Sequence, residues 1–185
     1  MKIFERRKRN NGERELYLFG IKIFKYKRNI IQAVDVARKL GVKIGENVRL
    51  VSMPNWGSEP YFIEIGNDVL ISFDCTFVTH DGCTHTCKQY SKDLIFKLGK
   101  INIGDNCFIG CKTTILPGVS IGNNCVVGAC SVVTKSIPDG EVWAGHPAKF
   151  ICKTEDLAHK LVESSKREEN IQLYESLMKI RQKNI

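Results

Sequence analysis

A six-residue period runs through the middle of this chain and limits what it can fold into. From residue 103 to residue 133, an aliphatic residue recurs at every sixth position, and glycine usually follows it. The positions that show this are Ile103-Gly104, Ile109-Gly110, Ile115, Ile121-Gly122, Val127-Gly128 and Val133. An earlier stretch has the same spacing at Ile65-Gly66, Ile71-Ser72 and Phe77-Val78. A short fixed period indicates a repeat architecture and outweighs local propensities.

The repeat has a simple geometric meaning. Each unit supplies one short strand and one turn, so three units complete a triangular coil of about eighteen residues. The aliphatic residue points inward, and a second inward position four places later holds mostly small or β-branched residues. These are Val69, Cys75, Cys107, Thr113, Val119, Cys125, Ser131 and Ile137. A β-sandwich is the alternative, but sandwich strands alternate with period two. The sequence therefore predicts a mainly β triangular prism.

The period also divides the chain. Residues 1–41 are expected to form a basic arm and a short helix, residues 42–152 the prism, and residues 153–185 a C-terminal helix that begins near Thr154. The period breaks between Asp81 and Asn102, which predicts a protruding loop over residues 81–102. No apolar run is long enough for a membrane span or a secretory signal, so a cytoplasmic protein is expected.

The positive charge is concentrated at the N-terminus. The chain has a formal net charge of +8, and ten of its Lys and Arg residues lie in residues 1–30 against three Glu. The apolar residues between Leu16 and Phe24 favour an arm that packs on the base of the prism as a strand or short helix. Weak contact with an anionic membrane surface is the alternative. No nucleic-acid-binding motif accompanies the charge, so no nucleic-acid partner is expected.

Cysteine and histidine placement raises the question of a metal. Three of the eight cysteines take the inward phase, which is typical of reduced thiols that pack as small apolar groups. In the predicted loop, His80, Cys83, His85 and Cys87 are all residue types that bind zinc, and a zinc-binding protein is one alternative. We expect no metal, because structural zinc sites usually pair two separated knuckles.

His80 stands at the start of the predicted loop, where a histidine is well placed to act as a general base near neutral pH. Four segments, one of which contains His80, belong together in one pattern. They are Asn55-Trp56-Gly57-Ser58-Glu59-Pro60, Phe77-Val78-Thr79-His80-Asp81-Gly82, the stretch from Val127 to Lys135, and Gly145-His146-Pro147-Ala148-Lys149. With these motifs the chain resembles the hexapeptide-repeat acyltransferases. That left-handed parallel β-helix family includes maltose, galactoside, serine and polysaccharide acetyltransferases.

The resemblance implies roles on the acceptor side. His80 matches the family's catalytic base, which takes a proton from the acceptor hydroxyl so that its oxygen attacks the thioester of acetyl-CoA. Asn55 matches a polar residue that faces this histidine across a subunit boundary. Glu59 or Asp81 would orient the imidazole or bind a sugar hydroxyl. The loop departs from the polysaccharide-type pattern at Cys83-Thr84-His85-Thr86-Cys87, which leaves the acceptor open.

The resemblance also implies where acetyl-CoA binds. Backbone groups of Cys111 and Ala129 match those that bind the pantetheine arm. Thr134, Lys135 and Lys149 match the end that receives the adenine and phosphates, where ammonium groups suit the charge.

The sequence thus predicts an acetyl-CoA-dependent O-acetyltransferase for a sugar hydroxyl in surface polysaccharide biosynthesis. Serine or an amino sugar is the alternative acceptor, and a non-catalytic scaffold of the same fold is an alternative of another class. A homotrimer is expected, because flat prism faces do not by themselves form a pocket for both substrates.

Overall fold

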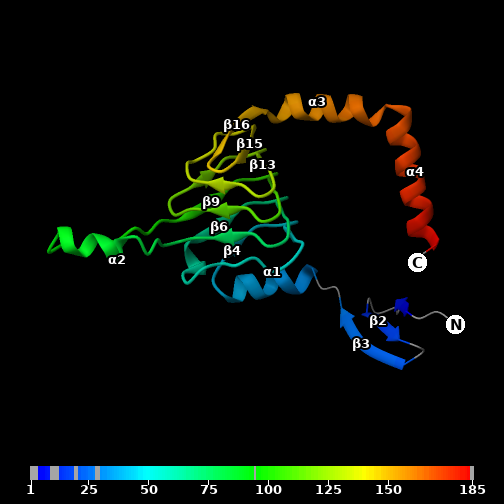
Figure 1. Ribbon diagram of the computed structural model, residues 1–185, viewed down its shortest axis with the longest axis horizontal. Helices are drawn as coiled ribbons and strands as arrows, with labels where there is room; N and C mark the ends of the chain where they lie inside the picture. Colours follow the sequence, from blue (N-terminus) through cyan, green and yellow to red (C-terminus); the bar gives the residue numbers. More distant parts are fainter. Residues whose placement is uncertain (1–3, 9–12, 19–20, 28–29, 94, 184–185) are drawn as a thin grey trace. The chain divides into compact units, whose positions relative to one another are not determined.

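The computed structural model describes residues 4–8, 13–18, 21–27, 30–93 and 95–183. The chain divides into two units, Ile30–Leu161 and a second that combines residues 1–29 with residues 162–185. The first contains the predicted prism, drawn in Figure 1 as stacked coils from α1 to β16.

The prism has three faces, each a sheet of strands from successive coils. The first face consists of β4 (Lys43–Ile44), β6 (Ile63–Ile65), β9 (Ile101–Ile103) and β12 (Ser120–Ile121). The second face consists of β5 (Arg49–Leu50), β7 (Leu70–Ile71), β10 (Phe108–Ile109), β13 (Val126–Val127), β15 (Glu141–Gly145) and β16 (Ala148–Lys153). The third face consists of β8 (Thr76–Phe77), β11 (Thr114–Ile115) and β14 (Val132–Val133). All neighbouring strands in these sheets are parallel except the β15–β16 hairpin that ends the prism.

The interior is filled as the repeat predicts. The inward aliphatic residues and the second inward positions are buried, including Cys75, Cys107 and Cys125. Two polar side chains in this row are also buried, and both donate to the same carbonyl. The hydroxyls of Thr113 and Ser131 lie 3.2 and 2.7 Å from the oxygen of Gly128, so neither is left without a partner. All eight cysteines are free thiols.

The corner between the first and second faces is closed by side chains. There the backbone N–H of one coil donates to an Asn or Asp side chain of the next coil. The series runs from Glu46 to Asn67, from Asn67 to Asp105, from Asp105 to Asn123 and from Asn123 to Asp139, at 2.7–2.9 Å. We call this series the Asx ladder. It satisfies amides that the strands leave unpaired, which stabilises the corner.

Short helices occur at the ends of the prism and in its loop. The helix α1 (Ile30–Lys39) precedes the first coil and ends before Gly41, within the segment 1–41 where a short helix is expected. The turn η1 (Pro60–Phe62) connects the first and second coils. The loop after His80 contains α2 (Thr84–Cys87) and η2 (Lys88–Tyr90) and extends away from the coils in Figure 1.

The remaining elements belong wholly or partly to the second unit. The strands β1 (Phe4–Lys8), β2 (Glu13–Leu18) and β3 (Ile21–Lys27) form an antiparallel sheet within the basic arm. The C-terminal segment forms two helices, α3 (Thr154–Ser165) and α4 (Glu168–Lys183), where the sequence pattern indicated one. Among the described residues, no helix combines the length and apolar character that a membrane crossing requires.

Candidate functional site

His80 lies at the corner between the third and first faces, at the point where the loop leaves the prism. It follows β8 and pairs with Leu98 in an isolated antiparallel bridge. The loop therefore leaves and returns at the same place. Strand β9 already begins at Ile101, so the structure returns to the prism just before the expected end of the loop at residue 102.

A carboxylate of the preceding coil holds the imidazole. Oε2 of Glu59 lies 2.8 Å from Nδ1 of His80, and the Thr79 hydroxyl donates to the same oxygen at 2.6 Å. The hydrogen bond from Thr79, followed by that from His80, lowers the pKa of Glu59 below its usual value. An ionised carboxylate only accepts hydrogen bonds, so Nδ1 of His80 carries the proton. Nε2 is then the basic nitrogen, on a side chain that is half exposed.

The other two acceptor-side residues have different surroundings. Asn55 pairs through its backbone with Thr76, one coil below His80 on the third face. Its side-chain oxygen accepts the N–H of Gly57 at 3.0 Å, and within the part of the chain described here it forms no bond with His80. Asp81 forms an ion pair with Lys97 at 2.6 Å. The carboxyl pKa of Asp81 falls to about 2, mainly because of the hydrogen bond from Lys97.

Cys111 and Ala129 occupy the corner between the second and third faces, on successive coils. They stand where Asn or Asp stands in the Asx ladder, but neither side chain can close the corner in that way. Within the described residues, no acceptor is bonded to the backbone N–H of Cys111 or Ala129. A Cβ at Gly110 would lie 2.4 Å from the Ala129 nitrogen, so glycine is needed there. The result is a strip of bare backbone with two unpaired donors, which we call the amide corner.

The remaining predicted residues lie toward the end of the prism. Thr134 and Lys135 follow β14, and Lys149 lies on β16; all three are exposed. Neither lysine forms an ion pair with another described residue. They are therefore free to meet an anion.

Four of the predicted residues thus form two groups on opposite edges of the third face. His80 and Glu59 lie at one edge, and Cys111 and Ala129 lie at the other. Sequence reasoning missed Thr79 and Lys97, which contact Glu59 and Asp81. Thr79 was visible only as the neighbour of His80, and nothing in the repeat pattern pointed to Lys97.

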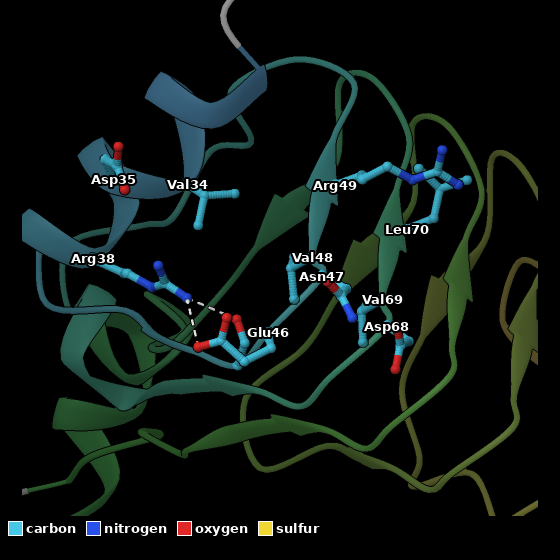
Figure 2. Close-up of a pocket in the computed structure, with 11 residues that line it drawn as sticks. Val34, Asp35, Arg38, Glu46, Asn47, Val48, Arg49, Asp68, Val69 and Leu70 are labelled. Carbon is cyan, nitrogen blue, oxygen red and sulfur yellow. Dashed lines mark hydrogen bonds and ion pairs between the residues drawn. The ribbon is translucent and has the colours of Figure 1, made fainter.

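A groove of about 700 Å³ lies elsewhere, between α1 and the first two coils (Figure 2). Val34, Val48 and Val69 contribute its apolar lining, and Arg38 donates to the oxygen of Gly45 at 2.8 Å. None of the predicted site residues lines it. In the described ranges no three His, Cys, Asp or Glu side chains come together as a metal site, and this includes the Cys and His residues of the loop.

Comparison with known proteins gives a consistent family assignment. Residues 100–135 match the model of the bacterial transferase hexapeptide (six repeats) family. The chain is 44% identical to Protein CapG of Staphylococcus aureus over 141 residues, which covers 75% of this chain and 80% of that protein.

Two further comparisons involve enzymes. The chain is 39% identical to galactoside O-acetyltransferase of Escherichia coli over 99 residues, or 53% of this chain and 47% of that protein. Among solved structures, a maltose O-acetyltransferase of Clostridium difficile 630 is 26% identical with a TM-score of 0.50. The alignment covers 69% of this chain and 78% of that one. Together with the parallel coils, these matches confirm the predicted left-handed β-helix.

Proposed function

Because the chain belongs to the hexapeptide-repeat acetyltransferases, we propose that it transfers an acetyl group from acetyl-CoA to a sugar hydroxyl, with His80 as general base. The observation that carries this proposal is the Glu59–His80 hydrogen bond. It fixes the tautomer in which Nδ1 carries the proton, so that Nε2, at an exposed position, is the nitrogen that can accept one. That is the arrangement a general base requires.

The proposed reaction needs no covalent enzyme intermediate. Nε2 of His80 takes the proton of the acceptor hydroxyl as the hydroxyl oxygen attacks the thioester carbonyl carbon. The tetrahedral intermediate then breaks its C–S bond, and the CoA sulfur leaves with the proton that the imidazolium returns. Glu59 stabilises the imidazolium while it exists, because its carboxylate remains ionised.

The amide corner supports the proposed position of the pantetheine arm. That arm contains two amide groups whose carbonyls accept hydrogen bonds, and Cys111 and Ala129 offer two unpaired N–H groups on successive coils. Successive coils are about 4.8 Å apart, so the two donors follow the direction of the prism axis. Lys149 lies beyond Ala129 at the end of the prism, and Thr134 and Lys135 follow β14 at the other edge of the third face in the same coil as Ala129; these three residues would receive the phosphates and adenine.

The separation of the two groups supports a homotrimer with shared sites. In one chain, the width of the third face lies between His80 and the amide corner. If the third face of each subunit is turned toward a threefold axis, the His80 corner of one subunit meets the amide corner of the next. Thr76, Thr114 and Val132 are half-buried residues of modest size on this face, which suits close packing. Asn55 would then face the histidine of a neighbouring subunit.

The acceptor is proposed to be a sugar hydroxyl of a surface-polysaccharide precursor in the cytoplasm, where acetyl-CoA is available. The names of the galactoside and maltose O-acetyltransferases support the sugar. Serine and amino sugars remain the alternative acceptors, and contact of the basic arm with an anionic membrane surface remains an open proposal.

A panel of acceptors tests the proposed reaction. We expect release of CoA from acetyl-CoA with at least one member of a set of free sugars, galactosides and nucleotide sugars, and an ester in the product. Release of CoA with serine alone, or an amide in the product, would mean that the acceptor is serine or an amino sugar and not a sugar hydroxyl. Binding of acetyl-CoA without transfer of its acetyl group to any class of acceptor would favour a non-catalytic scaffold of the same fold.

A further inference from the structure

Two backbone segments, which we call the legs, connect the protruding loop to the prism. They are hydrogen-bonded to each other directly beside His80. The N–H of Asp81 donates to the oxygen of Lys97, and the N–H of Gly99 donates to the oxygen of Thr79, both at 2.9 Å. His80 and Leu98 lie opposite each other between these two bonds. We call this pairing, with the side chains of Asp81 and Lys97, the neck. It fixes the backbone of His80 from both sides.

Both carboxylate oxygens of Asp81 form a bond in or beside the neck. Its Oδ2 lies 2.6 Å from Nζ of Lys97, on the opposite leg of the loop. Its Oδ1 accepts the N–H of Cys83 at 2.9 Å, which fixes the chain as it enters α2. The hydrogen bond from Lys97 also lowers the pKa of Asp81 to about 2, so the carboxylate is ionised near neutral pH. Each carboxylate oxygen of Asp81 thus has a partner within the loop.

The imidazole itself has little packing to hold it. The side chain of His80 is 50% exposed, and its one described side-chain partner is Glu59, on the coil below. The distance from Nδ1 to Glu59 therefore depends on where the backbone of His80 sits, and the neck determines that position. A displacement of about 1 Å in a reacting group lowers a rate by about 100-fold.

We propose that Asp81 and Lys97 are positioning residues that hold the neck closed and so keep His80 in register with Glu59. This inference rests on the proposed role of His80 as the base. It gives Asp81 a different role from the acceptor contact that the family resemblance offered, and it gives Lys97 a role that the sequence did not indicate.

Variants on each leg test the pair. Asp81→Asn keeps an acceptor for the N–H of Cys83 but removes the charge, and Lys97→Met removes the ammonium group. We expect each to lower kcat about tenfold or more with the KM for acetyl-CoA unchanged, while Lys97→Arg retains most of the rate. The matched control is Lys43→Met, which breaks an exposed Lys43–Glu64 ion pair of 2.5 Å on the first face and leaves kcat unchanged.

A second measurement needs no acceptor. The imidazole proton resonances of His80, assigned with His80→Ala, should shift in Lys97→Met and stay in place in Lys43→Met. Wild-type kcat in both neck variants, or unmoved His80 resonances, would overturn the proposal. A raised KM for the acceptor with unchanged kcat in Asp81→Asn would instead make Asp81 an acceptor contact.

The two proposals fail in different ways. If His80→Ala retains wild-type turnover, the proposed base is wrong and the neck loses its function with it. If His80→Ala is inactive and the neck variants are fully active, only the positioning role is wrong.

Discussion

Oε2 of Glu59 lies 2.8 Å from Nδ1 of His80, although the two residues are 21 positions apart in the chain. Glu59 precedes η1 at the end of the first coil, and His80 follows β8 at the end of the second. The stacking of two coils therefore builds the pair.

Removing the proposed base should remove most of the rate. We expect His80→Ala to lower kcat by about 100- to 10,000-fold, the usual contribution of general-base assistance. The Kd for acetyl-CoA should change little, because the proposed pantetheine contacts at Cys111 and Ala129 lie at the opposite edge of the third face. Steady-state kinetics with calorimetric binding of acetyl-CoA measures both. Turnover at the wild-type level would contradict the assignment, and His85→Ala serves as the control from the same loop.

Glu59→Gln should slow the reaction while preserving the shape of the site. The substitution removes the charge that stabilises the imidazolium, and hydrogen bonds to charged groups contribute about 1.5–3 kcal/mol, or roughly 10- to 150-fold in rate. The pH profile of kcat/KM should also change, because the carboxylate that contacts the imidazole is no longer present. In the wild type, the pKa of Glu59 is lowered, so its ionised form should persist below the usual titration range of a glutamate. An unchanged profile would mean that Glu59 does not act through His80.

Substitution of Lys149, at the end of the prism, should weaken acetyl-CoA binding and leave the chemical step unchanged. We expect Lys149→Ala to raise the KM for acetyl-CoA without lowering kcat, because a phosphate contact far from the thioester is present equally in ground and transition states. Removal of the 3′-phosphate from the donor should reduce the difference between wild type and variant. A variant that lowers kcat and leaves KM unchanged would place Lys149 outside the donor site.

The Asx ladder should contribute to stability. Asn123→Ala removes the acceptor for the N–H of Asp105 and a donor to Asp139, and we expect a loss of about 1–2 kcal/mol in the free energy of unfolding. Asn102→Ala is the matched control on the first face, where the side chain only reaches Ser120 at 3.3 Å, and it should stay within about 0.5 kcal/mol of wild type. Equal melting curves for the two variants would mean that the Asx ladder does not contribute to stability.

Shared sites should allow complementation between inactive subunits. When His80→Ala and Asn55→Ala chains are mixed and exchange, random assembly gives roughly a quarter of sites with both residues intact, and activity should recover accordingly. Sedimentation equilibrium should show a trimer before mixing. A monomer, or no recovery after verified exchange, would count against a site between subunits.

The sequence by itself determined the prism. The six-residue phase of the aliphatic residues assigns each inward position, because every third repeat must return to the same face, and the structure buries those side chains as expected. The motif around His80 marked the candidate base for a similar reason: the loop interrupts the phase immediately after it. Local spacing carries both signals.

Only the tertiary structure decided how the site residues are paired. Glu59 and Asp81 were interchangeable in the sequence, and stacking placed Glu59 on His80 while the return of the loop placed Lys97 on Asp81. Likewise, the structure was needed to show that the amides of Cys111 and Ala129 are unpaired. The comparison is with the Asx ladder, where Asn and Asp side chains accept the equivalent amides. These are contacts between coils, and the period fixes which residues point inward but not which outward side chains meet across the stack.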